Sequence, residues 1–120
     1  MKVTANGITM SYVLEGPPGA PVVTLSHSLA TNPGMWDAQI PVLTARYRVL
    51  RYETRGHGQT EAPGGAYTLE TLTADARALL EALGIARTLF VGLSMGGMIG
   101  QALALTAPNP FHPEECRCPA

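Results

Sequence analysis

The sequence predicts an α/β fold, in which parallel strands alternate with crossover helices after an opening β-hairpin. Short runs rich in β-branched and apolar residues recur along the first ninety residues, and stretches with helical spacing separate the later runs. Hydrophobic residues make up 46% of the 120 residues and charged residues 14%, a composition typical of one globular domain with a core.

The first elements are predicted as strands. Residues 3–5 and 8–13 are β-type runs, and the dipeptide Asn6-Gly7 between them accepts the positive φ angles of a type I′ turn. Residues 21–25, PVVTL, form a nearly continuous apolar run, which is typical of a strand buried on both faces of a parallel sheet.

Helices and strands alternate in the rest of the first hundred residues. A weak helical pattern covers residues 35–43, and residues 47–52 are predicted as a strand. The clearest helix is predicted over residues 69–83, where six apolar residues recur at helical spacing. Thr68 is placed to cap this helix and Gly84 to end it.

The last regular elements are a strand over residues 88–91 and a helix over residues 98–106. The pattern breaks at Pro108, because the final thirteen residues, PNPFHPEECRCPA, contain four prolines and no periodicity. We therefore predict an organised unit at residues 1–107 and an irregular tail at residues 108–120, with no strand or helix in the tail.

The tail also holds both cysteines. Cys116, Cys118 and the nearby His112 supply too few ligands at recognised spacings for a zinc site. The sequence favours two exposed thiols and no metal.

The stretch FVGLSMGG holds a G-x-S-x-G motif, with Ser94 between Gly92 and Gly96. Because it follows a predicted strand and precedes a predicted helix, it predicts a nucleophile elbow, a strained turn that needs small neighbours on either side. Ser94 is the candidate nucleophile. The backbone N–H of Met95 is predicted as one oxyanion donor, and that of Leu29, in the loop after the third strand, as the second.

Two other interpretations of the motif stay open. One is a glycine-rich turn that exposes a serine, and the other is a loop that binds phosphate. The sequence has neither a G-x-G-x-x-G pattern nor a G-K-[ST] ending here, so the elbow is favoured.

Four stretches resemble the α/β-hydrolases and, within them, the 3-oxoadipate enol-lactonases: LSHSLATNPGMWDAQIPVL, YRVLRYETRGHGQTEAP, YTLETLTADARALLEALGI and FVGLSMGGMIGQALA. The resemblance covers residues 1–107 and implies the N-terminal half of an α/β-hydrolase domain, a partial fold truncated after the helix that follows the elbow. It implies hydrolysis of a small carboxylic ester or lactone through an acyl-Ser94 intermediate, without cofactor. An esterase and a haloperoxidase-like perhydrolase are alternatives within this fold.

The sequence offers no credible proton acceptor for Ser94. In this fold the catalytic acid and the histidine follow the nucleophile, in that order. No aspartate follows Ser94, and His112, Glu114 and Glu115 are crowded into the tail in the reverse order. We therefore predict that the catalytic acid and histidine lie outside this chain, and that the chain alone is inactive.

Two earlier histidines receive other roles. His57, in the RGHG stretch, is predicted to order its turn, and His27 to shape the loop that supplies the second oxyanion donor. Truncation is expected to leave the edge of the 88–91 strand unpaired, which favours self-association through that edge. A non-catalytic remnant that acts through this edge is the alternative from another functional class.

Charge and hydropathy exclude several classes of partner. The formal net charge is −1, and no stretch approaches the ~18 apolar residues of a membrane span or shows the apolar core of a signal peptide. Four arginines cluster within ten residues: Arg46, Arg48, Arg51 and Arg55. We interpret them as flanking a buried strand and a turn, not as a phosphate-binding patch. We predict a cytoplasmic protein with a small-molecule substrate and no nucleic-acid or membrane partner.

Overall fold

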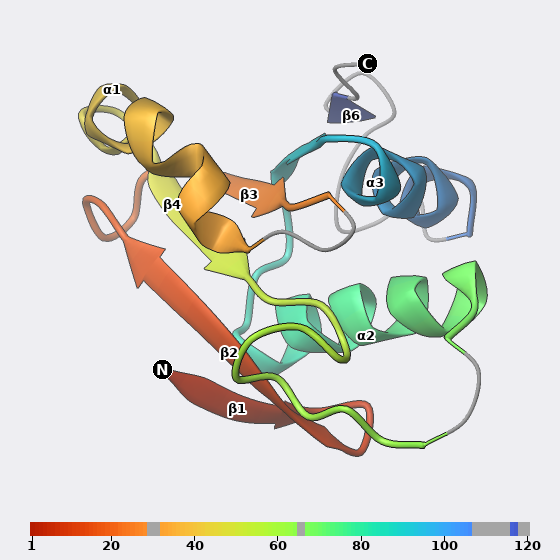
Figure 1. Cartoon of the computed structure of the whole chain (residues 1–120). Helices are drawn as coiled ribbons and strands as arrows, with labels where there is room; N and C mark the ends of the chain where they lie inside the picture. The colour runs from red at the N-terminus through yellow and green to blue at the C-terminus, as the bar shows by residue number, and fades with distance from the viewer. Residues whose placement is uncertain (29–31, 65–66, 107–115, 118–120) are drawn as a thin grey trace.

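The computed structural model of the chain describes residues 1–28, 32–64, 67–106 and 116–117. Within them one sheet runs in the order β1-β2-β4-β3-β5-β6 (Figure 1). The pairs β1–β2 and β2–β4 are antiparallel, and the other neighbours are parallel. The strands are Lys2–Ala5 (β1), Ile8–Glu15 (β2), Val22–Ser26 (β3), Arg48–Tyr52 (β4), Leu89–Gly92 (β5) and Cys116–Arg117 (β6). The predicted α/β architecture is confirmed.

The opening hairpin forms as predicted. Asn6 and Gly7 have φ angles of 51° and 77°, so both central residues of the turn lie in the left-handed region that an Asn-Gly pair accepts. The turn pairs Ala5 with Ile8 and sets the register of β1 on β2.

The first helical segment differs from the prediction of a single helix over residues 35–43. It consists of a 3₁₀ helix, η1 (Pro33–Gln39), followed by a short α-helix, α1 (Ile40–Thr44). The Asn32 side chain accepts the Gly34 N–H at 2.8 Å and so starts the segment at Pro33. Pro41 has no N–H to continue a hydrogen-bond ladder, and it occupies the first turn of α1, where none is needed.

The later helices form close to their predicted bounds. Helix α2 (Leu69–Ala82) is capped by Thr68, whose hydroxyl accepts the Thr71 N–H at 3.1 Å, and Gly84 follows its end with a φ of 70°. Helix α3 (Met95–Thr106) starts three residues before the predicted residue 98. The earlier start follows because the turn at Ser94 feeds directly into the first helical residue.

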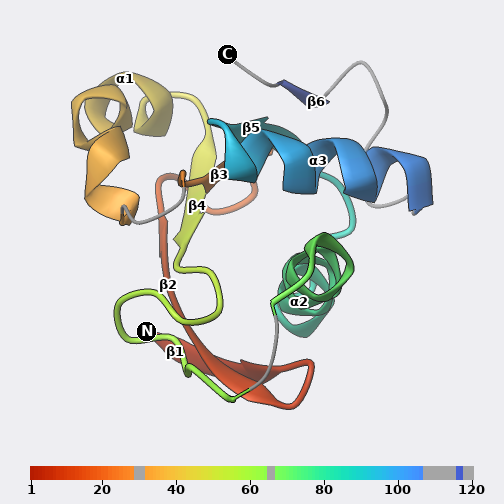
Figure 2. The same cartoon turned by 45° about the vertical axis from the view of Figure 1, so that its right-hand side comes forward.

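Helices cover the two faces of the sheet unequally. Helices α2 and α3 lie on one side of the strands, and η1 with α1 lies on the other (Figure 2). The first side holds the larger core, in which Leu50, Phe90 and Ile99 are fully buried. The second side buries Val23, Leu25 and Val49 against Trp36 of η1. Alternate residues of β3 and β5 therefore belong to different cores, as expected of central strands.

The tail departs from the prediction in one place. Residues 116–117 form β6, which pairs in parallel with β5 through Phe90 and Val91, so the prediction of no strand in the tail is wrong there. The edge of β5 that was expected to be unpaired is covered over these two residues. The predicted thiols cannot be placed, since Cys118 and the side chain of Cys116 lie outside the described part of the chain.

Candidate active site

Ser94 stands at the junction of strand and helix that the sequence predicted. Strand β5 ends at Gly92, α3 begins at Met95, and Ser94 between them is exposed with a φ of 55°. Among the described residues Asn6 is the only other non-glycine with a positive φ. Such a backbone costs about 1–3 kcal/mol, and it persists only where the surroundings enforce it.

The two glycines of the motif show what enforces it. A Cβ atom on Gly92 would overlap the Gly96 carbonyl group, and a Cβ on Gly96 would overlap the carbonyl oxygen of Ser26 in β3. Both obstacles are backbone atoms, which cannot move aside as a flexible side chain would. The turn around Ser94 therefore excludes every residue except glycine at these two positions.

The N-terminus of α3 lies directly behind Ser94. Met95 is its first residue and is buried. The first N–H groups of a helix have no partner within the helix, and the helix dipole places partial positive charge there. The start of α3 therefore favours negative charge beside Ser94. Leu29, the other predicted donor, lies outside the described residues, which on that loop end at Ser28.

His27 is buried and both of its ring nitrogens have partners within the fold. The ring is fully buried; its Nδ1 lies 2.8 Å from the Ser28 carbonyl oxygen, and its Nε2 accepts the Thr54 N–H at 3.0 Å. Burial lowers the pKa of His27, which opposes its acting as a proton acceptor. The prediction that this histidine shapes its loop agrees with these bonds.

His57 belongs to the loop that follows β4 (residues 53–61, called the β4 loop). Its Nδ1 lies 3.0 Å from the Thr54 hydroxyl and 3.2 Å from the Arg55 carbonyl oxygen. The rings of His57 and His27 are 4.9 Å apart between centroids, at a tilt of 55°. The two histidines and Thr54 therefore form one cluster between the loop after β3 and the β4 loop.

This strand, turn and helix arrangement around an exposed serine can be compared with known proteins. A family model described as the alpha/beta hydrolase fold matches residues 21–118, which is most of the chain. The chain belongs to the alpha/beta hydrolase fold family. The match begins just before β3 and ends just after β6.

Relatives within the alpha/beta hydrolase fold are hydrolases by name. The chain is 40% identical over 110 residues to 3-oxoadipate enol-lactonase 2 of Acinetobacter baylyi, covering 92% of this chain and 41% of the relative. It is 39% identical to the putative carbamate hydrolase RutD of Stutzerimonas stutzeri, covering 83% of this chain and 39% of the relative. The enol-lactonase structure from Burkholderia xenovorans LB400 is 43% identical, with a TM-score of 0.87 over 98% of this chain and 44% of that chain. The chain thus spans less than half the length of these relatives.

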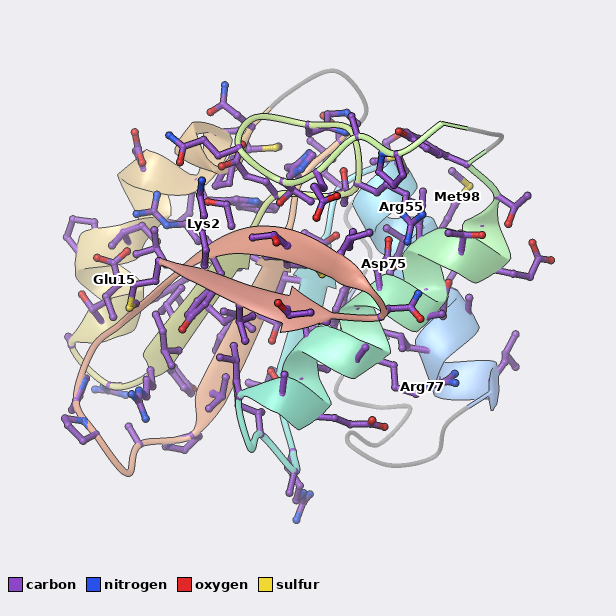
Figure 3. All side chains as sticks on the ribbon, turned by 90° about the horizontal axis from the view of Figure 1, so that it is seen from below. Lys2, Glu15, Arg55, Asp75, Arg77 and Met98 are labelled. Carbon is purple, nitrogen blue, oxygen red and sulfur yellow. The ribbon has the colours of Figure 1, made fainter. Side chains whose placement is uncertain are left out.

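An ion pair that was not predicted from the sequence anchors the β4 loop of this alpha/beta hydrolase chain. Arg55 lies beside Asp75 of α2 (Figure 3) and donates two hydrogen bonds of 2.9 Å to its carboxylate. Asn6 donates a third hydrogen bond of 2.8 Å to the same carboxylate. The Asp75 side chain is 2% exposed, and the carboxylate raises the pKa of Arg55. A signal was present, because Asp75 follows Leu72 by three residues and precedes Leu79 by four, which places a charge on the apolar stripe of the helix.

Two of the clustered arginines have acidic partners, as expected of residues that flank a strand and a turn. Arg55 pairs with Asp75, and Arg51 of β4 pairs with both Glu15 and Asp37 at 2.7 Å. These charges are therefore neutralised within the fold.

Among the described residues no group of three His, Cys, Asp or Glu residues is arranged to hold a metal ion. A hollow of about 370 Å³ beside η1 is lined by Val23, Leu25, Trp36 and Val91 among others, and Ser94 does not line it.

Among the described residues no helix is long and apolar enough to cross a bilayer. His112, Glu114 and Glu115, the weak substitutes for a catalytic acid and base, lie outside the described residues.

Proposed function

We propose that the chain supplies the nucleophilic half of a hydrolase that cleaves a small carboxylic ester or lactone through an acyl-Ser94 intermediate. The observation that carries the proposal is the left-handed backbone of Ser94, between two glycines that admit no side chain. Backbone strain of this kind concentrates at functional sites, where the surrounding structure holds it in place.

The proposed reaction has two steps. The Ser94 oxygen forms a bond to the carbonyl carbon, and its proton passes to a base. The bond from that carbon to the leaving oxygen then breaks, and the base gives the proton to the leaving oxygen. The oxyanion that forms between these events is stabilised by the Met95 N–H and the N-terminus of α3, with Leu29 proposed as the second donor. In the second step water gives one proton to the base while its oxygen bonds to the acyl carbon, the bond from that carbon to the Ser94 oxygen breaks, and the base passes the proton to Ser94 as the acid is released.

Lactone hydrolysis is the favoured activity because two of the relatives are named enol-lactonases, at 40% and 43% identity. The relative named as a putative carbamate hydrolase supplies a second candidate, since a carbamate carbonyl is attacked by the same nucleophile. An esterase or a perhydrolase of the same fold is a third. All of these reactions use an acylated serine, so Ser94 has one role in each.

The proton acceptor for Ser94 is proposed to lie outside the described residues. The Nε2 atom of His27 accepts the Thr54 N–H, and the Nδ1 atom of His57 lies 3.0 Å from the Thr54 hydroxyl. Because a serine alone is a weak nucleophile, we expect the 120-residue chain to turn over an activated ester very slowly. Rapid turnover by this chain that is lost on Ser94→Ala would contradict that expectation.

A chimera tests the proposed function directly. Residues 1–106 are joined to the part of Acinetobacter baylyi 3-oxoadipate enol-lactonase 2 that the chain does not cover, and hydrolysis of 3-oxoadipate enol-lactone is followed by absorbance. We expect turnover that falls by at least about 10³-fold on Ser94→Ala, as loss of a nucleophile does. Ser11→Ala, on β2, is the matched control and keeps the parent rate. Hydrolysis of a carbamate but not of the lactone would favour the second candidate.

A non-catalytic role through the sheet edge makes the opposite prediction. If the chain acts by pairing its β5–β6 edge with another chain, Ser94→Ala leaves that pairing unchanged. Charged substitutions at the same edge abolish the pairing. Self-association is measured by sedimentation of the purified chain. A dimer that persists in Ser94→Ala and dissociates in the edge variant would support this alternative.

A further inference from the structure

A second hollow, of about 350 Å³, lies between α2 and α3, on the side of the sheet away from η1 and α1. Most of its lining comes from the first half of α2 and the rest from the end of α3: Leu69, Glu70, Thr73, Ala74, Arg77, Ala102 and Leu105. Figure 3 shows Arg77 where the two helices lie side by side. Ser94 does not line this hollow, and it precedes the first residue of α3, whereas Leu105 lies near the last.

Apolar side chains at the rim of this hollow are exposed. Leu105 is 85% exposed, the highest value among the large hydrophobic residues that the structure describes, and Leu69 is 40% exposed. Met98 is 50% exposed, and it precedes Ala102 by four residues and Leu105 by seven, so these three residues share one face of α3. Single exposed apolar residues are common on protein surfaces, but these adjoin a hollow. Covering them removes apolar surface from water, which favours association.

Two charges of opposite sign line the same hollow. Glu70 is exposed and Arg77 is half-buried, and both belong to α2. They are seven residues apart, which is two turns and about 10 Å along the helix axis, so they lie on one face. Ala74 lies between them on that face, so a small side chain separates the two charges.

This spacing makes the face complementary to itself. When a second α2 lies antiparallel on the first, across a two-fold axis that passes close to Ala74, Glu70 of each copy meets Arg77 of the other. A parallel arrangement places Glu70 against Glu70 and Arg77 against Arg77, so repulsion between like charges opposes it. Packed helices lie about 8–10 Å apart, and alanine at the centre of the contact admits that approach.

We propose that the face formed by α2 and α3 around this hollow is an interface between two copies of the chain, related by a two-fold axis near Ala74. Two Glu70–Arg77 pairs set the antiparallel orientation, and burial of Leu69 and Leu105 supplies most of the affinity, since exposed ion pairs contribute little by themselves. The occupant is a second copy, because symmetry brings it charges at the required spacing. The inference does not depend on the proposed reaction, and it differs from pairing through the β5–β6 edge.

Sedimentation of the 120-residue chain over about 5 to 500 µM, the range for a small interface, tests whether it dimerises. We expect a monomer–dimer equilibrium that persists in Ser94→Ala. Glu70→Arg and Arg77→Glu each place like charges at both contacts, so we expect each to raise the dimer dissociation constant at least about tenfold. A chain that stays monomeric, or a dimer that survives both substitutions, would overturn the proposal. Survival in these variants with loss in the edge variant would assign the dimer to β5–β6.

The double variant distinguishes a lost contact from a damaged fold. Glu70→Arg also removes an acidic residue from the first turn of α2, where negative charge favours the helix dipole. Combining Glu70→Arg with Arg77→Glu keeps that cost and restores opposite charges at both contacts. We therefore expect the dissociation constant to return to within about threefold of the parent. A double variant that is folded by circular dichroism but dimerises as weakly as the single variants would contradict the charge pairing.

A mixture of the two single variants tests the two-fold axis without the double variant. In a heterodimer of Glu70→Arg with Arg77→Glu, each contact joins opposite charges, so we expect the mixture to dimerise although neither variant does so alone. A dye attached to the Glu70→Arg chain identifies the heterodimers. Arg46→Glu, at an exposed residue two positions before β4, changes the net charge as Arg77→Glu does and is the matched control. Equal binding of both partners by the Glu70→Arg chain would show general charge attraction and overturn the proposal.

The apolar part of the interface has its own matched pair of variants. Leu105→Ser removes apolar surface that the interface covers, whereas Val42→Ser makes the same kind of change at a residue that is 76% exposed on α1, across the sheet. We expect Leu105→Ser to raise the dissociation constant at least about tenfold and Val42→Ser to leave it within about twofold of the parent. An equal or larger effect of Val42→Ser would place the contact on the other side of the sheet and overturn the proposal.

Discussion

The elbow around Ser94 follows β5 and the β4 loop follows β4, the two strands that flank β3, but the two regions are held in place by different forces. At the elbow, Gly92 and Gly96 leave no space for a side chain, and Ser94 takes a backbone that is unfavourable for serine. In the β4 loop, an ion pair joins Arg55 to Asp75 and a hydrogen bond joins Thr54 to His27. The elbow is held by shape, and the loop is held by polar contacts that are buried or nearly so.

The difference has a physical consequence for how each region fails. Repulsion between overlapping atoms rises steeply as the distance between them falls, and overlap with a backbone atom cannot be relieved by a change of rotamer. A polar contact fails when one partner is removed, because the other is left buried without a hydrogen bond or a counter-charge. The stability of the elbow should therefore depend on side-chain volume alone. The stability of the β4 loop should depend on side-chain charge and on pH.

The largest expected effect is on the elbow. Gly96→Ala places a methyl group on the Ser26 carbonyl oxygen, and separating the two moves α3 away from β3, so we expect the free energy of unfolding to fall by about 4 kcal/mol or more. Gly64→Ala is the matched control, since a methyl group there meets nothing within 4 Å. Urea unfolding measures both. A loss of less than about 1 kcal/mol in Gly96→Ala would mean that shape does not hold the elbow.

The next effect is on the β4 loop. Asp75→Ala removes the acceptor of three hydrogen bonds from Arg55 and Asn6. We expect the free energy of unfolding to fall by about 3 kcal/mol, the low end of the range for buried pairs, because the Arg55 side chain is 14% exposed. Asp37→Ala is the control, since that side chain is 73% exposed beside Arg51 and the pair should contribute less than about 1 kcal/mol. Similar losses in the two variants would contradict the distinction between them.

The elbow could be predicted from the sequence because its constraint is local. The glycines and the serine lie within five residues, and the requirement for small neighbours is visible in the residue types themselves. The strands and α2 were predictable for the same reason, since apolar periodicity and the caps at Thr68 and Gly84 are short-range signals. The start of α3 was predicted three residues too late, because the glycine-rich residues that follow Ser94 carry no helical pattern although the helix begins there.

The β4 loop could not be predicted because its contacts join residues far apart in the chain. Asp75 bonds to Asn6, 69 residues away, and Thr54 bonds to His27, 27 residues away. No spacing rule connects such pairs before the fold brings them together. The residue type alone gave one hint, since a carboxylate on the apolar stripe of a helix needs a partner. The two-residue strand β6 is too short to carry any periodic signal.

A smaller effect, of opposite sign, sharpens the comparison at Ser94. Ser94→Gly removes the side chain from a residue at φ 55°, so we expect the free energy of unfolding to rise by about 1 kcal/mol while the proposed nucleophile is lost. Ser94→Ala is the control, because alanine also loses the hydroxyl but keeps the strain. Thermal unfolding of the two variants separates these effects. Equal stability would show that the elbow stores no strain at this residue.

The smallest effect, the pH dependence of stability, tests the polar side of the comparison. Burial lowers the pKa of His27 in the folded chain, opposed by its bond to Ser28 and assisted by the nearby His57, with Glu53 acting in the raising direction. In the unfolded chain the pKa is about 6.5. Between the two values the unfolded chain binds a proton that the folded chain does not, so stability is fully present above about pH 7 and is lost as the pH falls through 6.5 towards the folded pKa.

The measurement is the unfolding temperature of the parent chain and two variants at pH 7.5, 6.5 and 5.5. We expect the unfolding temperature of the parent to fall with pH over this range, above the pH at which most carboxylates begin to titrate. His27→Asn should flatten the slope, because asparagine binds no proton. Ser94→Gly should keep the parent's slope, because the elbow contains no titratable side chain at Gly92, Ser94 or Gly96. A parent-like slope in His27→Asn would assign the pH dependence to another group and leave the two regions equally insensitive to protons.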